Sequence, residues 1–199
     1  MDIDIANAIA KQLGVTITWK EMAFGDLIPT LQEGKVDMVI AGMYITDARK
    51  ELVDMSDGYA DTGLVIVTRA NDGTISKSED LSGKTACVKS GSTGAKFIQS
   101  LNDGGAKVKV QEYADTVTSL EDLSNGFCDA VMNDKINSLE YIKTHPELKV
   151  ASDVLQPAQL GIAVQKGDSE LMALINSTVQ SMKSSGELDA LYNTWVLGQ

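Results

Sequence analysis

Apolar and polar positions follow two different periods along the chain, which predict helices and strands in turn. Apolar residues recur every three or four positions over 2–14, and Gly14 closes the last turn, as in an amphipathic helix. Short β-branched or apolar runs predict strands at 15–19, 36–42, 64–69, 85–91, 107–113, 128–133 and 161–168. Further helices are predicted at 26–34, 93–102, 116–126, 169–186 and 187–198. Such alternation favours an α/β fold with mainly parallel sheets and helices on their faces.

One helix-to-strand corner occurs twice in the sequence. The two copies share a leucine, a glycine, an aspartate and a valine at identical spacing. These residues are Leu31, Gly34, Asp37 and Val39 in the first copy and Leu123, Gly126, Asp129 and Val131 in the second. Leucine, glycine and valine are common at such corners, so chance is an alternative. Because both copies lie at the same place in their helix-turn-strand units, two similar lobes are favoured over one large sheet.

Two polar segments indicate where the chain crosses between these lobes. Residues 68–83 are rich in turn formers, and residues 152–161 contain a proline before the next apolar run. If the chain crosses at both segments, its two ends share one lobe. We therefore expect lobe 1 to comprise 1–67 and 160–199, lobe 2 to comprise 68–159, and a cleft to separate them.

The composition of the chain limits the classes of molecule that it is expected to bind. The net charge of -11 opposes binding to nucleic acid or to an anionic membrane surface. The longest apolar runs are far shorter than the ~20 residues of a membrane-spanning helix, and no signal peptide opens the chain. Cys87 and Cys128 have neither zinc-site nor CxxC spacing and lie in apolar runs. Two buried thiols are favoured over a disulfide, which stays open as the alternative.

Ligands of open α/β sheets collect at the carboxyl ends of strands. The repeat places Gly42 and Asp134 at matching strand ends, and Arg49 follows Gly42 closely. Residues 90–94, which are rich in glycine and hydroxyl groups, follow a strand and open a helix, so their N–H groups are suited to an anion. An ordinary Ser/Thr helix cap is an equal alternative for this turn, and Asp134 is also placed to cap the next helix.

Five stretches carry a resemblance that covers essentially the whole chain. They read "AFGDLIPTLQEGKVDMVIAGMYITDAR", "MSDGYADTG", "LSGKTACVKSGSTG", "NGFCDAVMND" and "LGIAVQKGD". In this order they resemble the polar amino-acid-binding proteins of ABC importers, which are solute-binding proteins of family 3. The resemblance implies the two-lobe periplasmic-binding-protein type II fold with two crossover hinge segments. It also implies a periplasmic or cell-surface lipoprotein that needs no cofactor, captures a free amino acid between closing lobes and delivers it to a membrane permease.

The resemblance also implies how the ligand carboxylate is held. Arg49 matches the arginine that binds this group in a bidentate manner, a role that suits a planar guanidinium with parallel N–H donors. Ser92 and Thr93 match the second carboxylate contact, which comes from the other lobe.

The rest of the ligand is assigned in the same way. Asp134 matches the acid that receives the α-ammonium, helped by backbone carbonyls around Ala41 and Gly42. Phe24 matches an aromatic residue that packs against the aliphatic part of the ligand. Lys89 lies where relatives often contact the ligand side chain, a role that suits an acidic or polar ligand, but a solvated lysine is favoured over this role.

The sequence departs from the family pattern in two places. Tyr44 replaces a Ser or Thr that contributes a short hydroxyl, so it is expected to narrow the pocket, stack on the ligand or turn outward. The chain also opens inside the first helix motif, so lobe 1 lacks the usual first strand. Unpaired strand edges are costly, so we expect the lobe to rearrange or a second copy to supply a strand in a swapped homodimer. Ligand binding is then weakened.

Two other functions are alternatives to that of a transport protein. An enzyme of the same fold, acting like a dehydratase on a small carboxylic acid, requires an acid or base in the cleft. The only histidine, His145, lies in a polar turn, and Asp134 favours an amino acid, so no catalytic residue is predicted. The third function, the ligand-sensing domain of a receptor, differs only in what is attached to the chain ends.

Overall fold

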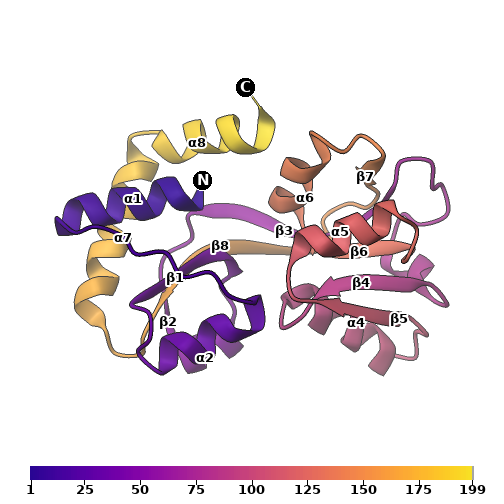
Figure 1. Cartoon of the computed structure of the whole chain (residues 1–199), viewed down its shortest axis with the longest axis horizontal. Helices are drawn as coiled ribbons and strands as arrows, with labels where there is room; N and C mark the ends of the chain where they lie inside the picture. The colour runs from indigo at the N-terminus through magenta and orange to yellow at the C-terminus, as the bar shows by residue number, and fades with distance from the viewer. Residues whose placement is uncertain (199) are drawn as a thin grey trace. The chain divides into compact units, whose positions relative to one another are not determined.

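Strands β3 (Ala60–Arg69) and β8 (Gln156–Val164) each contain a boundary between two compact units of the computed structural model, which describes residues 1–198. Unit 1 comprises Met1–Asp61 and Ala158–Gln199, and unit 2 comprises Thr62–Pro157 (Figure 1). These boundaries fall a few residues before the expected lobe limits at 67/68 and 159/160. The expected limits stay a prediction of where the lobes divide.

Unit 1 combines short strands with most of the helices. Its further elements are α1 (Asp2–Leu13), η1 (Phe24–Asp26), α2 (Leu27–Gln32), β1 (Met38–Tyr44), α3 (Asp47–Leu52), β2 (Asp54–Met55), α7 (Ser169–Ser184), α8 (Glu187–Tyr192) and η3 (Asn193–Leu197). The predicted amphipathic helix is α1, which buries Ile5 and Ile9 one turn apart. It ends at Gly14, whose positive φ of 68° closes the last turn.

The sheet of unit 1 is built on β8. This strand pairs antiparallel with β1, where Met38 lies opposite Val164 and Tyr44 opposite Leu160, and antiparallel with β2. The register of β1 shifts between Val39 and Met43, which marks an irregularity in the strand. The core beneath this sheet consists of Leu31, Val39, Met43, Val53 and Ala163.

Strand β1 pairs with β8 along one edge, and its opposite edge faces a hollow of about 610 Å³. Residues 15–20, residues 35–40 and the C-terminal half of α1 line it. The predicted strand at 15–19 is wrong, because no residue from 15 to 23 is in a strand. A strand exists only where a neighbour completes its hydrogen-bond ladder. Here the β-branched run and β1 both line the hollow, and the run pairs with no strand in the described residues.

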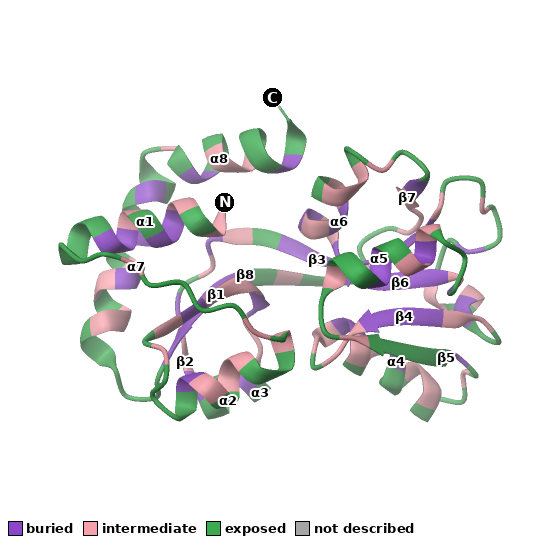
Figure 2. Ribbon diagram, in the orientation of Figure 1, coloured by how far each residue is buried: buried purple, intermediate pink, exposed green. Residues whose placement is uncertain are grey.

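Unit 2 has parallel pairing at its centre. Its further elements are η2 (Ser78–Leu81), β4 (Thr85–Lys89), α4 (Thr93–Asp103), β5 (Lys109–Tyr113), α5 (Thr116–Ser124), β6 (Ala130–Asp134), α6 (Lys135–Ile142) and β7 (Leu148–Val150). Strand β4 pairs parallel with β5 and β6, whereas β3 pairs antiparallel with β6 and β7. The burial of the strands agrees with these pairings. Strands β4 and β6, which have a neighbour on each edge, are mostly buried, and β5 is mostly exposed (Figure 2).

The two cysteines form a disulfide, so the prediction of two free thiols is wrong. Cys87 lies in the middle of β4, and Cys128 lies two residues before β6. Because β4 and β6 are neighbouring parallel strands, both side chains reach the same core, where they pack with Leu120 and Leu123. The Cα atoms are 6.1 Å apart, although 41 positions separate the residues in sequence. Spacing alone could not indicate this pair.

No helix within residues 1–198 is both long enough and apolar enough to cross a bilayer.

Candidate functional site

Arg49 lies on a short helix that a threonine begins. Thr46 is the N-cap of α3, and its hydroxyl accepts a hydrogen bond from the Arg49 N–H at 3.3 Å. The position of Arg49 in the first turn directs its side chain back toward the end of β1, so the residue is only 7% exposed. Arg49 is therefore a buried cation.

The partners of the Arg49 guanidinium are a carbonyl and an aromatic ring. Its Nη1 donates to the Tyr44 carbonyl at 2.8 Å, and its Cζ lies 5.4 Å from the centre of the Phe24 ring. Among residues 1–198, no acidic side chain forms an ion pair with it. Burial lowers the pKa of Arg49, and interaction with the Tyr44 side chain partly offsets this. Arginine stays protonated at neutral pH, so this buried charge is suited to an anionic ligand.

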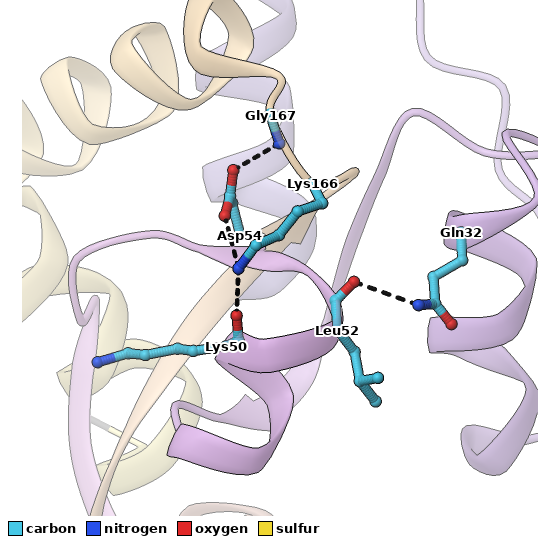
Figure 3. A network of polar contacts seen from close by, with 6 residues as sticks. All are labelled: Gln32, Lys50, Leu52, Asp54, Lys166 and Gly167. Atoms are coloured by element: carbon cyan, nitrogen blue, oxygen red, sulfur yellow. Dashed lines mark hydrogen bonds and ion pairs between the residues drawn. The ribbon is translucent and has the colours of Figure 1, made fainter.

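A polar network fixes the end of the helix that carries Arg49 (Figure 3). Lys166 donates to the Lys50 carbonyl in the last turn of α3 and forms an ion pair with Asp54 at 3.4 Å. The Gly167 N–H donates to Asp54 at 2.8 Å, and this hydrogen bond, with a smaller contribution from Lys166, lowers the pKa of the Asp54 carboxyl. A cation at a helix C-terminus satisfies carbonyls that lack intrahelical partners.

The end of β1 supplies the other predicted contacts of unit 1. Gly42 has a positive φ of 56°, and its N–H donates to the Asp2 carboxylate at 2.8 Å. Ala41, which precedes it, is half-buried. Tyr44 is only 5% exposed, so of the alternatives weighed for it an outward-turned side chain is excluded. Unit 1 thus brings Phe24, Tyr44 and Arg49 into contact.

The predicted anion turn of unit 2 begins α4. The Ser92 hydroxyl caps this helix by accepting from the Ala95 N–H at 3.1 Å, which agrees with the ordinary cap weighed from sequence. Thr93 is the first helical residue and is half-buried. Gly94 permits close packing here, because a Cβ atom at this position would lie 2.8 Å from the Met132 carbonyl of β6.

Asp134 is the last residue of β6 and is 6% exposed. One carboxylate oxygen accepts from the Thr62 hydroxyl at 2.6 Å, and the other accepts from the Asn137 N–H at 3.0 Å. Asp134 therefore caps α6, as its alternative assignment predicted. Lys89 ends β4, and because β4 and β6 run parallel, Lys89 and Asp134 lie at the same edge of this sheet.

Two residues of the site region escaped the sequence analysis. Thr62 contacts Asp134 across 72 positions, and Asp2 contacts Gly42 across 40 positions. No local motif signals either contact. His145 stacks on Tyr141 with ring centres 3.8 Å apart. Within the described part of the chain, no three His, Cys, Asp or Glu residues form a group that could hold a metal ion.

Comparison with known proteins gives a consistent result. The family described as bacterial extracellular solute-binding proteins, family 3, matches residues 1–198. The chain is 32% identical to a putative ABC transporter arginine-binding protein 2 of Escherichia coli K12 over 98% of this chain and 80% of that protein. It is 30% identical to the L-cystine-binding protein TcyJ of the same strain over 98% of this chain and 73% of that protein. The structure of an ancestral arginine-binding protein bound to arginine superposes with a TM-score of 0.91 at 41% identity, over 98% and 86% of the two chains.

Proposed function

Because this chain belongs to the bacterial extracellular solute-binding proteins of family 3, we propose that it binds a polar amino acid and delivers it to the permease of an ABC importer. Relatives named for arginine, cystine, histidine and glutamine support this class of ligand. An arginine-bound and a glutamine-bound structure of an ancestral arginine-binding protein, both 41% identical to this chain, support it further. The individual amino acid is left to experiment.

The observation that carries the proposal is the buried guanidinium of Arg49. A buried charge is costly unless a partner compensates it, and the carbonyl of Tyr44 and the ring of Phe24 neutralise none of its charge. A carboxylate supplies the missing negative charge and accepts two parallel N–H bonds. Every α-amino acid carries such a group.

The remaining ligand contacts are proposed from the positions that the family pattern assigns. Asp134 receives the α-ammonium together with the carbonyls of Ala41 and Gly42. Thr93 and the cap of Ser92 add a second contact to the carboxylate. Phe24 and Tyr44 of unit 1 pack against the aliphatic part of the ligand. Lys89 of unit 2 contacts the side chain of the ligand.

We further propose that the chain is a binding protein without catalytic activity of its own. The family and the relatives named above are binding proteins of transport systems, which supports this proposal. Extracellular location follows from the family, and a lipid anchor at the cell surface or in the periplasm is the finer part of the proposal. Turnover of a bound amino acid in a mass-spectrometric assay would contradict it.

Isothermal calorimetry against L-arginine, L-histidine, L-glutamine and L-cystine tests the proposed function. We expect saturable binding of at least one of them, with affinity reduced about 100-fold in Arg49→Ala, since two charge-assisted hydrogen bonds are lost. Lys50→Ala, which removes the exposed neighbouring cation on the same helix, is the matched control and should bind normally. Asp134→Ala should also weaken binding. Equal binding by Arg49→Ala and Lys50→Ala would exclude the assigned carboxylate site.

The edge of β1 beside the hollow supports one further proposal, a strand-swapped homodimer. A strand from a second copy would complete the ladder of β1 and cover the apolar lining. Light scattering over a range of concentrations tests it, because a swapped dimer doubles the mass. A monomer at every concentration would remove the proposal while leaving the amino-acid site untouched.

A further inference from the structure

Asp2 connects the first helix to the strand end that the proposed site uses. Its carboxylate accepts two hydrogen bonds, one from the Gly42 N–H at 2.8 Å and one from the Tyr59 hydroxyl at 2.9 Å. The two donors lie 40 and 57 positions from Asp2 in sequence, and Asp2 lies in the first turn of α1, where the helix favours negative charge. Both carboxylate oxygens therefore have defined partners.

These contacts form a closed ring of interactions within unit 1. Gly42 lies in the irregular part of β1, and Tyr44 lies two residues further along, opposite Leu160 of β8. The Leu160 carbonyl accepts the Tyr59 N–H at 2.9 Å, and Tyr59 returns to Asp2 through its hydroxyl. Tyr59 is only 3% exposed, which restricts its side chain. The ring fixes the part of β1 whose Tyr44 carbonyl holds Arg49.

The hydrogen bond to Gly42 also fixes the direction of a carbonyl. The peptide bond between Ala41 and Gly42 is trans, as are the other described peptide bonds, so its C=O and N–H point in opposite directions in one plane. When Asp2 holds the Gly42 N–H, the Ala41 carbonyl points away from Asp2. The positive φ of Gly42 shows that the backbone here adopts a conformation in which a side chain is disfavoured.

We propose that Asp2 is a positioning residue of the amino-acid site, because it orients the Ala41–Gly42 peptide plane so that the Ala41 carbonyl receives the ligand ammonium. This inference rests on the proposed function and adds a residue that contacts no ligand atom. A carbonyl that is already aligned loses no conformational freedom when the ligand binds, so the affinity rises. The negative charge of Asp2 adds a favourable field for a cationic group nearby.

Three variants separate positioning from charge and from general stability. Asp2→Ala removes both hydrogen-bond acceptors. Asp2→Asn removes the charge but keeps an oxygen for the Gly42 N–H, and its NH₂ group can donate to the Tyr59 hydroxyl. Asp4→Ala is the matched control, because Asp4 lies in the same first turn of α1 and accepts from the Trp195 indole N–H at 2.9 Å.

The experiment measures the dissociation constant of the amino acid that the wild type binds, by calorimetry at a temperature where all variants are folded. We expect Asp2→Ala to weaken binding about tenfold, the size of one lost hydrogen bond to a charged group. Asp2→Asn should restore affinity to within about threefold of wild type, and Asp4→Ala should bind as wild type does. Unfolding midpoints recorded in parallel should fall by similar amounts in the two alanine variants, which separates affinity from stability.

The outcomes distinguish this inference from the function on which it rests. If the wild type binds an amino acid and Asp2→Ala binds it equally well, the positioning role is overturned and the proposed function stands. Equal weakening by Asp2→Ala and Asp4→Ala overturns the positioning role as well, because the effect then belongs to the helix end. If the wild type and Asp4→Ala bind no amino acid, both the proposed function and the positioning role are overturned.

Discussion

The same helix-turn-strand corner is built twice, once in each unit, and the strands around the two copies differ in completeness. In unit 2, α5 leads through Gly126 into β6, and β6 pairs along β4, which has a strand on each edge. In unit 1, α2 leads through Gly34 into β1, and β1 runs along the hollow. Both glycines have positive φ, 68° and 81°, so the two turns are alike. A local pattern therefore determines the corner, whereas the neighbouring strand determines whether the sheet is complete.

The elements before each corner extend this comparison. In unit 2, β5 precedes α5 and flanks β4. In unit 1, residues 15–19 precede α2 and flank the hollow. Helix α1 packs on β1 as α4 packs on β6. By this comparison the hollow takes the place in unit 1 that β4 takes in unit 2, and we expect it to accept one parallel strand.

The first prediction concerns a crosslink that only unit 2 carries. Because residues 1–61 and 158–199 contain no cysteine, the Cys87–Cys128 disulfide stabilises unit 2 alone. Replacing both residues by alanine should lower the free energy of unfolding of unit 2 by about 4 kcal/mol, the loop-closure value for a separation of 41 residues. Urea unfolding measures this, and wild type kept in reductant should match the variant. An unchanged midpoint in both samples would contradict the prediction.

The second prediction compares the two buried charges. Asp134 has two hydrogen-bond donors as partners, whereas Arg49 has a carbonyl and a ring. Asp134→Ala should lower the stability of the ligand-free protein by about 2 kcal/mol, because it removes a helix cap and leaves the buried Thr62 hydroxyl without this acceptor. Arg49→Met should leave stability unchanged or raise it, since the buried cation has no anionic partner among residues 1–198 to lose.

Thermal unfolding without ligand measures both variants of this second prediction. Lys50→Ala serves as the control for helix α3. If Arg49→Met destabilises the protein as much as Asp134→Ala does, the guanidinium is a structural group and its assignment as an anion receptor loses its main support.

The elements that the sequence predicted are those with a complete local signal. Helix α1 follows from its apolar period and Gly14, and the corners at Gly34 and Gly126 follow from the same kind of pattern. The run at 15–19 has the composition of a strand, yet whether it forms one depends on a neighbour that local sequence does not describe. The sequence predicts parallel pairing, and this occurs between β4 and its neighbours, whereas β8 pairs antiparallel with β1, and β3 pairs antiparallel with β6.

The residues of the candidate site divide in the same way, into those whose roles follow from neighbouring sequence and those whose contacts join distant positions. The helix-capping roles of Ser92 and Asp134 were weighed as local alternatives, and the structure contains both caps. The contact of Asp2 with Gly42 and the disulfide join residues about 40 positions apart, which the fold brings together. The assignment of Arg49 to a carboxylate comes from the family pattern and stays a proposal, which the burial of Arg49 without an acid partner among residues 1–198 supports.

The third prediction fills the hollow. A copy of residues 83–92, with alanine in place of Cys87, is joined directly before Asp2, so that the strand-to-helix connection of unit 2 is reproduced. The added strand should raise the free energy of unfolding by about 2 kcal/mol, because it buries apolar side chains and completes the ladder of β1. Fluorescence of Trp19, which is 55% exposed and lines the hollow, should shift to shorter wavelength. The same addition should abolish a swapped dimer.

A matched control for this addition carries proline in place of Val88 within the added copy. Proline lacks the N–H and disfavours a central strand, so the gain in stability should disappear. Equal stability of the two extended proteins would show that the hollow does not accept a strand.

The fourth prediction, with the smallest effect, compares the repeated aspartates. Asp129 makes two hydrogen bonds with Thr85, the first residue of β4. Its N–H donates to the Thr85 carbonyl at 2.8 Å, and its carboxylate accepts from the Thr85 N–H at 2.8 Å. Its counterpart Asp37 is exposed and lines the hollow. Asp129→Ala should lower stability by about 1 kcal/mol, whereas Asp37→Ala should change it by less than about 0.5 kcal/mol. The same Asp37→Ala change is then made in the protein extended before Asp2. A loss of stability that rises toward the Asp129→Ala value would show that the added strand takes the place of β4. A loss that stays negligible would show that the two corners are not equivalent.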